Sequence, residues 1–482
     1  MLFEIHASKP TGESAVFMYD NMTNTLTNQA DPTITYQYDV LESQEGWSES
    51  LPFDKHTPLR KSKQITNLKI QLGLSCNYSC SYCSQKFVER APETNKRQID
   101  QFLAKLDVLE LSSQQGLNIE FWGGEPFVYW KTMKPLAEAI RDKYKHWENP
   151  PRFHIITNGS LLTEEICDWL SMMNFNVGIS HDGPGQKVRG PDPFDDPETK
   201  RVILGFYRAM RRLGKPISFN CMINRDNQSR KQVYEWFVQL TGDPNVQIGE
   251  GAFIDAYDED GIRSSLQTLN EHFDYRQRTF GEIYAASGNI AFQGTIQKVQ
   301  NFIHGILNHS EAKYVGQRCG MDDERTIAVD LRGNIVTCQN VSAVHTSHNG
   351  QPHLGGNLDD YDNVALRSST HWSKRLECSG CPVLHLCRGS CMYTDGKYWE
   401  VTCNNAYSDN LPLFALAVHS ITGYIPTLIK ADGLPPERQD VFGTVLGLED
   451  RILYTPGKVV SEKNMVVEGV EVYGKSRLVT EA

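Results

Sequence analysis

The sequence predicts an α/β protein, with an incomplete barrel of six parallel strands wrapped by helices and a cysteine-rich region after it. Two observations lead to this fold class. Between residues 66 and 255, short apolar runs alternate repeatedly with amphipathic helical patterns, as in parallel sheets that are covered by helices. Ten of the twelve cysteines fall into two groups, one near residue 80 and one from 319 to 403. Such clustering favours metal ligation.

Size and charge narrow the class of protein. A chain of 482 residues is long enough for two or three domains, one of them large. Hydrophobic residues make up 39% and charged residues 22%, as in ordinary soluble globular proteins. The formal net charge of −11 argues against a nucleic-acid or membrane-surface binder, because phosphate recognition needs a basic face.

The location of the protein is predicted from its start and from its longest apolar stretch. The opening Met-Leu-Phe-Glu-Ile-His lacks the basic start and the long apolar core of a signal peptide. A membrane-spanning helix needs about 20 mostly apolar residues. The stretch from Leu411 to Ile429 contains two prolines and a glycine, so it predicts a buried helix followed by a turn. We therefore expect a cytoplasmic protein without a membrane segment, in which thiols stay reduced.

Five segments are predicted along the chain. They are a small β-rich region (1–65), the partial barrel (66–255), a bridge of amphipathic helices (256–315), the cysteine-rich domain (316–425) and a C-terminal extension (426–482). The first segment has strand candidates at Phe3–His6, Ala15–Tyr19 and Thr33–Tyr38, and the last has strand-like runs such as Met465–Tyr473. We assign no chemistry to the extension.

Within residues 66–255, the predicted strands alternate with predicted helices. The predicted strands are Leu68–Leu72, Asn118–Phe121, Phe153–Ile156, Val177–Ser180, Ile217–Met222 and Val246–Ile254. The predicted helices are Asn95–Leu111, Lys131–His146, Thr163–Met173, Glu198–Leu213 and Arg230–Leu240. In barrels of this kind the chemistry lies on loops that leave the C-terminal ends of the strands.

The first such loop carries three cysteines, Cys76, Cys80 and Cys83. Spacings of three and then two residues can turn three sulfurs toward one point on a tight loop. Thiolates are soft ligands, and a set of three suits an iron–sulfur cluster that keeps one iron open. The alternatives are a zinc site short of its fourth ligand or three structural cysteines, although structural zinc sites usually combine two separated ligand pairs. Cys167 and Cys221, outside both groups, are expected to be small buried hydrophobes.

The spacing CxxxCxxC, with an aromatic residue directly before the third cysteine, resembles the radical S-adenosylmethionine (SAM) enzymes. The next strand ends in Gly-Gly-Glu-Pro, which resembles the family's motif for the methionyl end of SAM; paired glycines allow a close backbone approach, and a carboxylate can accept a protonated amine. The fourth strand ends in a segment that resembles the family's Ser-x-Asp-Gly-Pro segment near the SAM ribose. The resemblance implies SAM contacts at Tyr82, Gly123, Gly124, Glu125, Asn158, Ser180, Asp182 and Arg189.

The second cysteine group resembles the SPASM domain, which carries auxiliary iron–sulfur clusters. Its seven members are Cys319, Cys338, Cys378, Cys381, Cys387, Cys391 and Cys403, and a zinc ribbon would leave three of them unexplained. The resemblance implies a distal cysteine group for one cluster, made of Cys378, Cys381, Cys387 and Cys403. It implies a nearer cysteine group for another, made of Cys319, Cys338 and Cys391.

The nearer cysteine group is one ligand short of four. Residues 305–318, where related domains have a further cysteine, contain none. A fourth ligand could be a non-cysteine side chain, a distant residue or the substrate. The resemblance therefore implies a partial (β/α)6 TIM-like barrel of the radical SAM type with a C-terminal SPASM domain, holding SAM and three [4Fe–4S] clusters.

Radical SAM enzymes with SPASM domains mostly modify peptides or proteins. We therefore expect a maturase that abstracts hydrogen from a ribosomally made precursor peptide (RiPP), with an external electron donor such as flavodoxin or ferredoxin and no nucleic-acid partner. No residue is assigned as the catalytic acid or base, although Glu250 and Asp255 lie near the end of the sixth strand. One alternative is an anaerobic sulfatase maturase, but Gln339 stands where that group carries an Asp, and an amide cannot take a proton. Another is a non-catalytic iron–sulfur protein for electron transfer.

Overall fold

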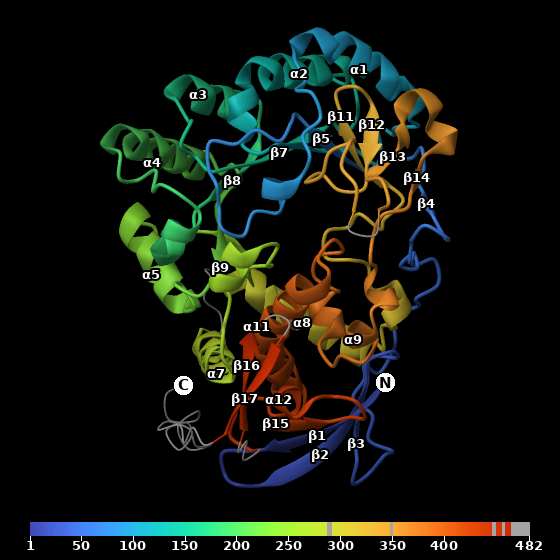
Figure 1. Cartoon of the computed structure of the whole chain (residues 1–482), viewed down its shortest axis with the longest axis vertical. Helices are drawn as coiled ribbons and strands as arrows, with labels where there is room; N and C mark the ends of the chain where they lie inside the picture. Colours follow the sequence, from blue (N-terminus) through green and yellow to red (C-terminus); the bar gives the residue numbers. More distant parts are fainter. Residues whose placement is uncertain (287–291, 348–349, 446–449, 456–457, 464–482) are drawn as a thin grey trace.

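The computed structural model describes residues 1–286, 292–347, 350–445, 450–455 and 458–463 (Figure 1). Its largest element is a nine-stranded sheet in the order β10-β9-β8-β7-β6-β5-β11-β12-β13. Six strands of this sheet follow one another along the chain: β5 (Asn67–Gln71), β6 (Asn118–Trp122), β7 (Arg152–Thr157), β8 (Asn176–Ser180), β9 (Ile217–Ile223) and β10 (Ile248–Phe253). Each of them pairs with the next in parallel, which confirms the predicted six-stranded partial barrel.

Helices on the outside of the barrel separate these strands. They are α1 (Ile99–Lys105), α2 (Trp130–Lys143), α3 (Glu164–Met172), α4 (Pro197–Arg212) and α5 (Arg230–Thr241), and Figure 1 shows α1 to α5 along the outer arc of the molecule. The side chains of Thr163, Asp196 and Ser229 cap the first turns of α3, α4 and α5. Gly242 ends α5 with a φ of 72°, a conformation that glycine adopts without strain.

The predicted helix over Asn95–Leu111 is too long. Only Ile99–Lys105 is α-helical, and the flanking segments Lys96–Gln98 and Leu106–Val108 are 3-10 turns. A capping box between Asn95 and Gln98 starts the first turn, and the burial of Leu106 and Leu109 in the barrel core directs the last one. Tertiary packing therefore shortens the helix.

Strand pleating divides the side chains of the barrel between its two faces. Alternate residues such as Leu68, Ile70 and Ile119 join the main hydrophobic core. Their neighbours Lys69 and Glu120 line a cavity inside the barrel. Because successive side chains point to opposite faces of a strand, the interior of this partial barrel is polar while its outer face is apolar.

A hairpin from the cysteine-rich region extends the barrel sheet. Its strands are β11 (Thr326–Asp330) and β12 (Asn334–Val336), joined by a turn in which Gly333 has a φ of 86°. Pairing of β11 with β5 in parallel was not predicted, and it holds the following cysteine, Cys338, beside the barrel. Strand β13 (Leu354–Asn357) completes the sheet, and β14 (Ala365–Leu366) pairs with β4 (Leu59–Arg60).

The N-terminal region forms a second, four-stranded sheet in the order β15-β1-β2-β3. Its strands are β1 (Leu2–Ser8), β2 (Ser14–Asp20), β3 (Thr25–Asn28) and β15 (Ile425–Lys430), so a strand from late in the chain pairs with the first. The predicted strand at Thr33–Tyr38 is wrong: it makes only an isolated bridge between Thr27 and Thr35. Asp31 accepts hydrogen bonds from the backbone and hydroxyl of Thr33 and bends the chain there.

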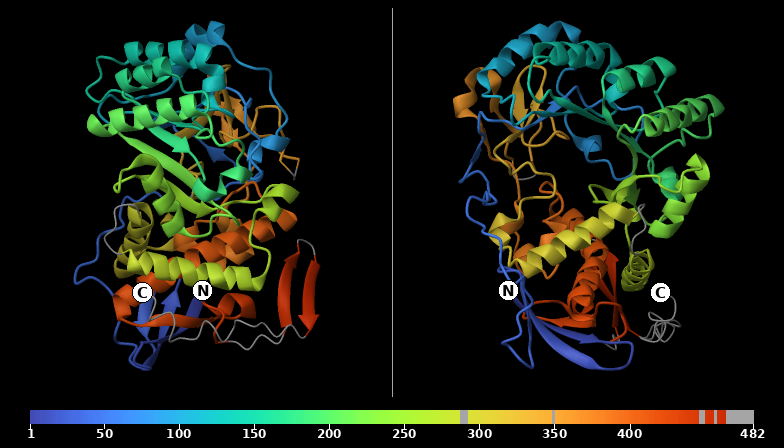
Figure 2. Two further views of the ribbon diagram at one scale, coloured as in Figure 1. Left: turned by 90° about the vertical axis from the view of Figure 1, so that its left-hand side faces the viewer. Right: turned by 180° about the vertical axis from the view of Figure 1, so that it is seen from behind.

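A helical layer lies between this sheet and the barrel (Figures 1 and 2). It contains α6 (Glu259–Arg263), α7 (Leu269–Ala285), α8 (Gln293–Leu307) and the long α11 (Gly396–Thr422), which packs on α7 and α8. Residues of α7, α8 and α11 share one hydrophobic core with β1, β2, β3 and β15. Shorter elements are α9 (Leu376–Ser379), α10 (Leu384–Cys387), α12 (Pro436–Gln439) and the hairpin β16 (Asp450–Thr455) and β17 (Lys458–Lys463).

The apolar stretch near the C-terminus is buried, as predicted. Helix α11 contains its first part, Gly423 ends the helix with a φ of 79°, and β15 follows. Among the described residues, no helix has the length and hydropathy of a membrane span. The predicted strand-like run Met465–Tyr473 lies outside the described residues.

Candidate functional site

The loop after β5 brings its three thiols together. Burial raises the pKa of Cys80 to about 12, and the neighbouring thiols of Cys83 and Cys76 act in the same direction, whereas Arg189 opposes the shift. The backbone N–H of Tyr78 donates a hydrogen bond of 3.3 Å to Cys76 Sγ. The arrangement is a single loop that presents three sulfurs and a backbone donor, which suits a cluster with one open iron.

The Gly-Gly-Glu-Pro turn after β6 packs directly against this cysteine loop. The backbone N–H of Glu125 donates to the carbonyl of Ser75 at 3.1 Å. A Cβ atom on Gly124 would lie 2.4 Å from that carbonyl oxygen and 2.7 Å from Cys76 Cβ. Only glycine allows so close an approach of the two segments. The sequence analysis placed these two segments after consecutive strands of the barrel, and the structure brings them into contact.

The carboxylate of Glu125 links two neighbouring loops of the barrel through hydrogen bonds. It is 2% exposed and accepts hydrogen bonds from the N–H of Phe127, the hydroxyl of Thr157 and the N–H of Asn158, at 3.2, 2.7 and 2.8 Å. Burial raises its pKa while these donors lower it. Glu125 therefore ties the end of β6 to the end of β7, and its contact with SAM stays a prediction. Asn158 in turn donates from Nδ2 to Asn77 Oδ1 at 2.9 Å, next to the cysteine loop.

Three predicted residues, one from the loop after β5 and two from the loop after β8, meet at one buried ion pair. Asp182, fully buried, accepts hydrogen bonds from the hydroxyl of Tyr82 at 2.5 Å and from Arg189 Nη2 at 2.9 Å. The Arg189 guanidinium also lies over the Tyr82 ring, 5.6 Å from its centroid. Ser180, two residues before Asp182, is buried at the end of β8. The sequence predicted these residues one by one and not as a connected set.

Arg189 has one donor left over. Its Nε atom is buried and has no hydrogen-bond partner among the described residues. A buried donor without an acceptor costs about 1–3 kcal/mol. An anionic ligand group, such as the carboxylate of SAM, would supply the acceptor, so the residues present fit the cofactor that the sequence implies.

The distal cysteine group surrounds a single small cavity. Cys378 on α9, Cys381, Cys387 on α10 and Cys403 on α11 all line it, together with Trp399 and Tyr407. Burial raises the pKa of Cys381 to about 12. Four thiols from different parts of the cysteine-rich region therefore line one space, in the grouping that the SPASM resemblance implies.

The nearer cysteine group lies beside the barrel, and its Cys319 lines the cavity inside the barrel. Cys338 interacts electrostatically with Cys319 and Cys391, and burial raises its pKa to about 12. The side chain of Tyr257 interacts with the Cys391 thiol. Asp255 accepts hydrogen bonds from Ser390 Oγ at 2.6 Å and from Arg318 Nη2 at 2.7 Å. Over all the described residues, no three His, Cys, Asp or Glu side chains converge closely enough to bind a single metal ion, so the thiols of these groups stand further apart than the ligands of one ion.

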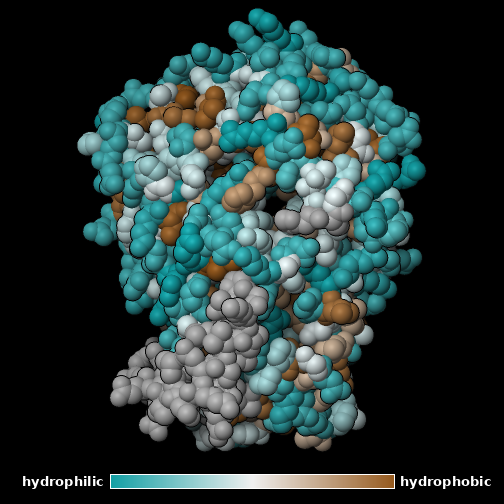
Figure 3. Space-filling view, viewed as in Figure 1, coloured by the Kyte–Doolittle hydropathy of each residue, from teal (hydrophilic) through white to brown (hydrophobic). Residues whose placement is uncertain are grey.

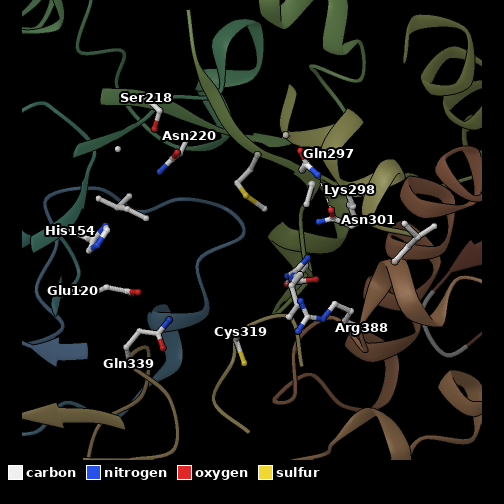
Figure 4. Close-up of a pocket in the computed structure, with 18 of the residues that line it drawn as sticks. Glu120, His154, Ser218, Asn220, Gln297, Lys298, Asn301, Cys319, Gln339 and Arg388 are labelled. Atoms are coloured by element: carbon white, nitrogen blue, oxygen red, sulfur yellow. Dashed lines mark hydrogen bonds and ion pairs between the residues drawn. The ribbon is translucent and has the colours of Figure 1, made fainter. Parts of the chain in front are cut away.

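A cavity of 1120 Å³ separates the barrel from the cysteine-rich and helical parts. Figure 4 shows Glu120, His154, Ser218 and Asn220 of the barrel on one side and Gln297, Lys298, Asn301 and Arg388 on the other, with Cys319 and Gln339 at its edge. The face in Figure 3 is mainly hydrophilic, with a hollow in its upper half. Small-molecule pockets have volumes of about 300–1,000 Å³, so this cavity is large enough for part of a peptide.

The polar groups on the barrel wall are held in place. Glu120 Oε2 accepts a hydrogen bond of 2.8 Å from Trp122 Nε1 and lies 3.7 Å from Lys69 Nζ. Burial lowers the pKa of His154, so its imidazole is neutral at pH 7. Asp255 also lines the cavity. The side chain of Glu250, the other candidate acid or base, lies outside the described residues.

Residues 70–237 match the family model of the "Radical SAM superfamily". This part of the chain is a radical SAM domain. Among curated proteins, the radical SAM cyclopropyl synthase TigE of Paramaledivibacter caminithermalis is 24% identical over 35% of this chain and 37% of its own length. A serine-type anaerobic sulfatase-maturating enzyme of Klebsiella pneumoniae is 22% identical over 66% of this chain and 80% of its own length.

Solved structures show the same fold. The structure described as "Native anSMEcpe with bound AdoMet and Cp18Cys peptide" has a TM-score of 0.52 and 18% identity, over 74% of this chain and 99% of that one. Several of the curated relatives are matched over only about a third to a half of their length, for example 37% of TigE and 54% of a protein of Methanocaldococcus jannaschii. Together the comparisons show a radical SAM domain at residues 70–237 and, over about three quarters of the chain, a fold shared with solved structures that bind AdoMet.

Two side chains beside the cysteine groups were missed from the sequence. Tyr257 contacts Cys391, and Arg438 Nη2 donates a hydrogen bond of 3.2 Å to Cys403 Sγ. Neither belongs to a motif, and Arg438 lies in the extension to which no chemistry was assigned. No signal in the sequence could have identified them, because each contact depends on how α11 and its neighbours fold.

Proposed function

We propose that this protein is a radical SAM maturase that abstracts hydrogen from a residue of a ribosomally made precursor peptide. The observation that carries the proposal is the large cavity, which opens between the radical SAM barrel and the nearer cysteine group. When bound and reduced, the SAM cluster supplies the electron that splits SAM into methionine and a 5′-deoxyadenosyl radical, which takes hydrogen from an unactivated C–H bond.

The loop of Cys76, Cys80 and Cys83 would hold that cluster. Gly123 and Gly124 let the backbone approach the methionyl end of SAM, and Glu125 keeps this turn in position through Thr157 and Asn158. The Asp182–Arg189 pair would place an arginine donor toward the SAM carboxylate, with Tyr82 and Ser180 beside it. In this scheme the chain binds and orients the cofactor and excludes water from it.

Two auxiliary [4Fe–4S] clusters would occupy the cysteine-rich domain. The distal cysteine group supplies four thiolates to one of them, and the nearer cysteine group supplies three to the other. The domain boundaries proposed from the sequence, 66–255, 256–315 and 316–425, follow these functional parts. The regions 1–65 and 426–482 share a sheet through β1 and β15.

A peptide substrate is supported by the cavity and by similar proteins. The cavity wall carries hydrogen-bonding side chains from both sides, which suits a polar chain rather than a small apolar ligand. The solved structure with the same fold holds a Cp18Cys peptide together with AdoMet. An external donor such as flavodoxin or ferredoxin would deliver the electron.

Anaerobic reconstitution tests the proposal. The purified protein with reduced cluster and SAM should produce 5′-deoxyadenosine, and a peptide encoded beside it should change in mass. Formation of 5′-deoxyadenosine without any modified neighbouring peptide would overturn the peptide substrate. Absence of 5′-deoxyadenosine would overturn the radical chemistry and favour a non-catalytic iron–sulfur protein.

A second candidate is a sulfatase maturase, because two thirds of the chain align with enzymes of that name. The side chain that follows Cys338 argues against it. Gln339 lines the cavity at the place where a base would be needed, and its amide has no basic site. Conversion of a sulfatase-derived peptide to formylglycine would restore this candidate.

A further inference from the structure

The C-terminal extension places an arginine on the distal cysteine group. Arg438 lies on α12, next to α11 (Figure 1). Its Nη2 atom donates hydrogen bonds to Cys403 Sγ at 3.2 Å and to Asn404 Oδ1 at 2.7 Å. Cys403 is one of the four thiols that line the distal cavity. The guanidinium therefore contacts a sulfur that would be a cluster ligand.

Neighbouring groups hold Arg438 in this position. Its guanidinium carbon lies 4.9 Å from the centroid of the Tyr407 ring. The Tyr407 hydroxyl donates a hydrogen bond of 2.6 Å to the backbone carbonyl of Arg438. The aromatic ring and the two hydrogen-bond acceptors leave little freedom to the guanidinium, so its charge is a constant part of the environment of Cys403.

Other basic side chains are also close to the distal cysteine group. Arg375 interacts with Cys378 and Cys403, and Lys298 and Arg318 interact with Cys387. Glu377, which also lines the distal cavity, is exposed to solvent, where its charge is screened. Together with Arg438, these groups amount to four cations and one exposed carboxylate near the distal thiols.

The nearer cysteine group has a different balance of charge. Lys69 and Arg318 interact with Cys319, and so does the carboxylate of Asp322. The carboxylate of Asp255 interacts with Cys391. Lys61 also interacts with Cys319, and Arg375 with Cys391, so four cations and two buried carboxylates face the nearer thiols.

Charge and hydrogen bonds of this kind act on the reduction potential of a cluster. Reduction adds negative charge, so a nearby cation and an N–H···S hydrogen bond stabilise the reduced state more than the oxidised state. The effect is large in a buried site, where the dielectric constant is low and salt screens weakly. The Arg438 guanidinium supplies both contributions at the distal site. At the nearer site the N–H of Asn340 donates a hydrogen bond of 3.4 Å to Cys338 Sγ, but two buried carboxylates offset part of the positive charge.

From these contacts we infer that Arg438 raises the reduction potential of the distal auxiliary cluster above that of the nearer one. An electron shared between the two clusters then resides on the distal cluster, away from the cavity. The inference rests on the proposed ligation of both clusters. It assigns a role to the C-terminal extension: completing the polar environment of the last cysteine of the domain.

The test is a redox titration followed by electron paramagnetic resonance. The full chain with Cys76→Ala, Cys80→Ala and Cys83→Ala removes the SAM cluster and leaves the two auxiliary clusters as the only signals. We expect two midpoint potentials in this parent protein. Arg438→Gln should shift the higher one to a more negative value and leave the lower one in place, whereas Arg438→Lys, which keeps the charge, should shift it less.

Arg276→Gln is the matched control. Arg276, on α7, is buried, whereas Arg438 is half-buried, and Arg276 also lies over the Tyr407 ring, at 5.2 Å. It donates hydrogen bonds to the hydroxyl of Ser408 and to the carbonyls of Glu437 and Asp440. This variant should destabilise the same region and move the higher potential less than Arg438→Gln does, because Arg438 adds a direct hydrogen bond to a thiol. An equal shift in Arg276→Gln would assign the effect to packing and overturn the inference.

Iron content separates the inference from the proposed ligation. A parent protein with iron and sulfide for fewer than two clusters would contradict the ligand assignment itself. Two clusters whose potentials are the same in the parent, Arg438→Gln and Arg438→Lys proteins would overturn the role of Arg438 and leave the ligation intact. If Arg438→Gln does not retain iron, the comparison of Arg438→Lys with the parent decides.

Discussion

The two cysteine regions of this protein are assembled in different ways. Around Cys76, Cys80 and Cys83, the partners come from the ends of neighbouring parallel strands, which regular topology brings to one edge. Around the distal cysteine group, the thiols come from α9, α10, α11 and the turns between them, and nothing regular relates these elements. The first site therefore depends on a repeating scaffold, and the second depends on individual long-range contacts.

Loss of one cysteine from each region should have the largest effect and should separate their roles. Cys76→Ala should abolish SAM cleavage, because the SAM cluster would lose one of only three ligands. Cys403→Ala should reduce peptide modification far more than SAM cleavage, provided that the protein remains folded. Quantitation of 5′-deoxyadenosine and of peptide mass under anaerobic conditions measures both. Equal loss of cleavage in the two variants would contradict this division.

Two buried ion pairs, one beside the SAM site and one away from it, allow their contributions to protein stability to be compared. Asp182 pairs with Arg189 at 2.9 Å beside the SAM site, and Asp409 pairs with Arg230 at 2.7 Å between the barrel and α11. Removal of one partner of a buried pair costs about 3–5 kcal/mol. Asp182→Asn and Asp409→Asn should both lower the unfolding temperature.

Only the first of these variants should also weaken SAM binding. An affinity loss of tenfold or more is expected for Asp182→Asn, since each factor of ten corresponds to about 1.4 kcal/mol. Equilibrium binding of SAM to the reconstituted, folded proteins measures it. A comparable loss in Asp409→Asn would show that the SAM site depends on general stability rather than on its own ion pair.

Glycine substitutions compare the close contact at the SAM site with an open helix surface. In Gly124→Ala the new methyl group would meet the backbone of Ser75, and overpacking of this kind costs about 1–3 kcal/mol. Gly205, in the middle of α4, has no atom within 4 Å of its Cβ position, so Gly205→Ala should stabilise the protein by about 1 kcal/mol. Thermal unfolding followed by circular dichroism measures both changes. A stable Gly124→Ala protein with unchanged cluster content would contradict the packing of the turn on the cysteine loop.

The smallest expected effect is a pH dependence from buried histidines. Burial lowers the pKa of His272, between α7 and α11, well below its usual value, and lowers the pKa of His154 in the barrel. A lowered folded-state pKa contributes stability that is present above about pH 6.5 and is lost as the pH falls toward the folded-state pKa. For a fully buried imidazole, each decrease of one in the folded-state pKa relative to the unfolded-state pKa corresponds to about 1.4 kcal/mol of stability.

Substitution of His272 should therefore reduce the loss of stability in acid. His272→Gln keeps a polar group near Ser408, whose hydroxyl lies 2.8 Å from His272 Nδ1, and removes the titration. Unfolding measured between pH 5 and pH 8 should vary less in this variant than in the original protein. His154→Gln, at a half-buried position, should change the pH dependence less; the reverse order would contradict the assignment.

Much of the barrel could be predicted because its signals are local. Strand positions follow from apolar runs, and the cysteine spacing of the first loop lies within one turn of chain. The errors fell where local pattern and packing disagree: Thr33–Tyr38 forms a turn held by Asp31, and only the middle of Asn95–Leu111 is helical. The burial of Cys167 and Cys221 was predicted correctly from their place in a helix and a strand.

The sequence by itself determined the parallel six-stranded barrel, the three-thiol loop with its Gly-Gly-Glu-Pro neighbour, and the presence of a second cysteine group. These features follow from the periodicity of hydrophobic residues and from the spacing of the cysteines and glycines. Only the tertiary structure decided that β11 extends the barrel, that β15 joins the first strand, that Tyr82, Asp182 and Arg189 form one cluster, and that Arg438 contacts Cys403. Each of these contacts joins residues with no shared pattern, so it follows from chain packing and is invisible in residue spacing.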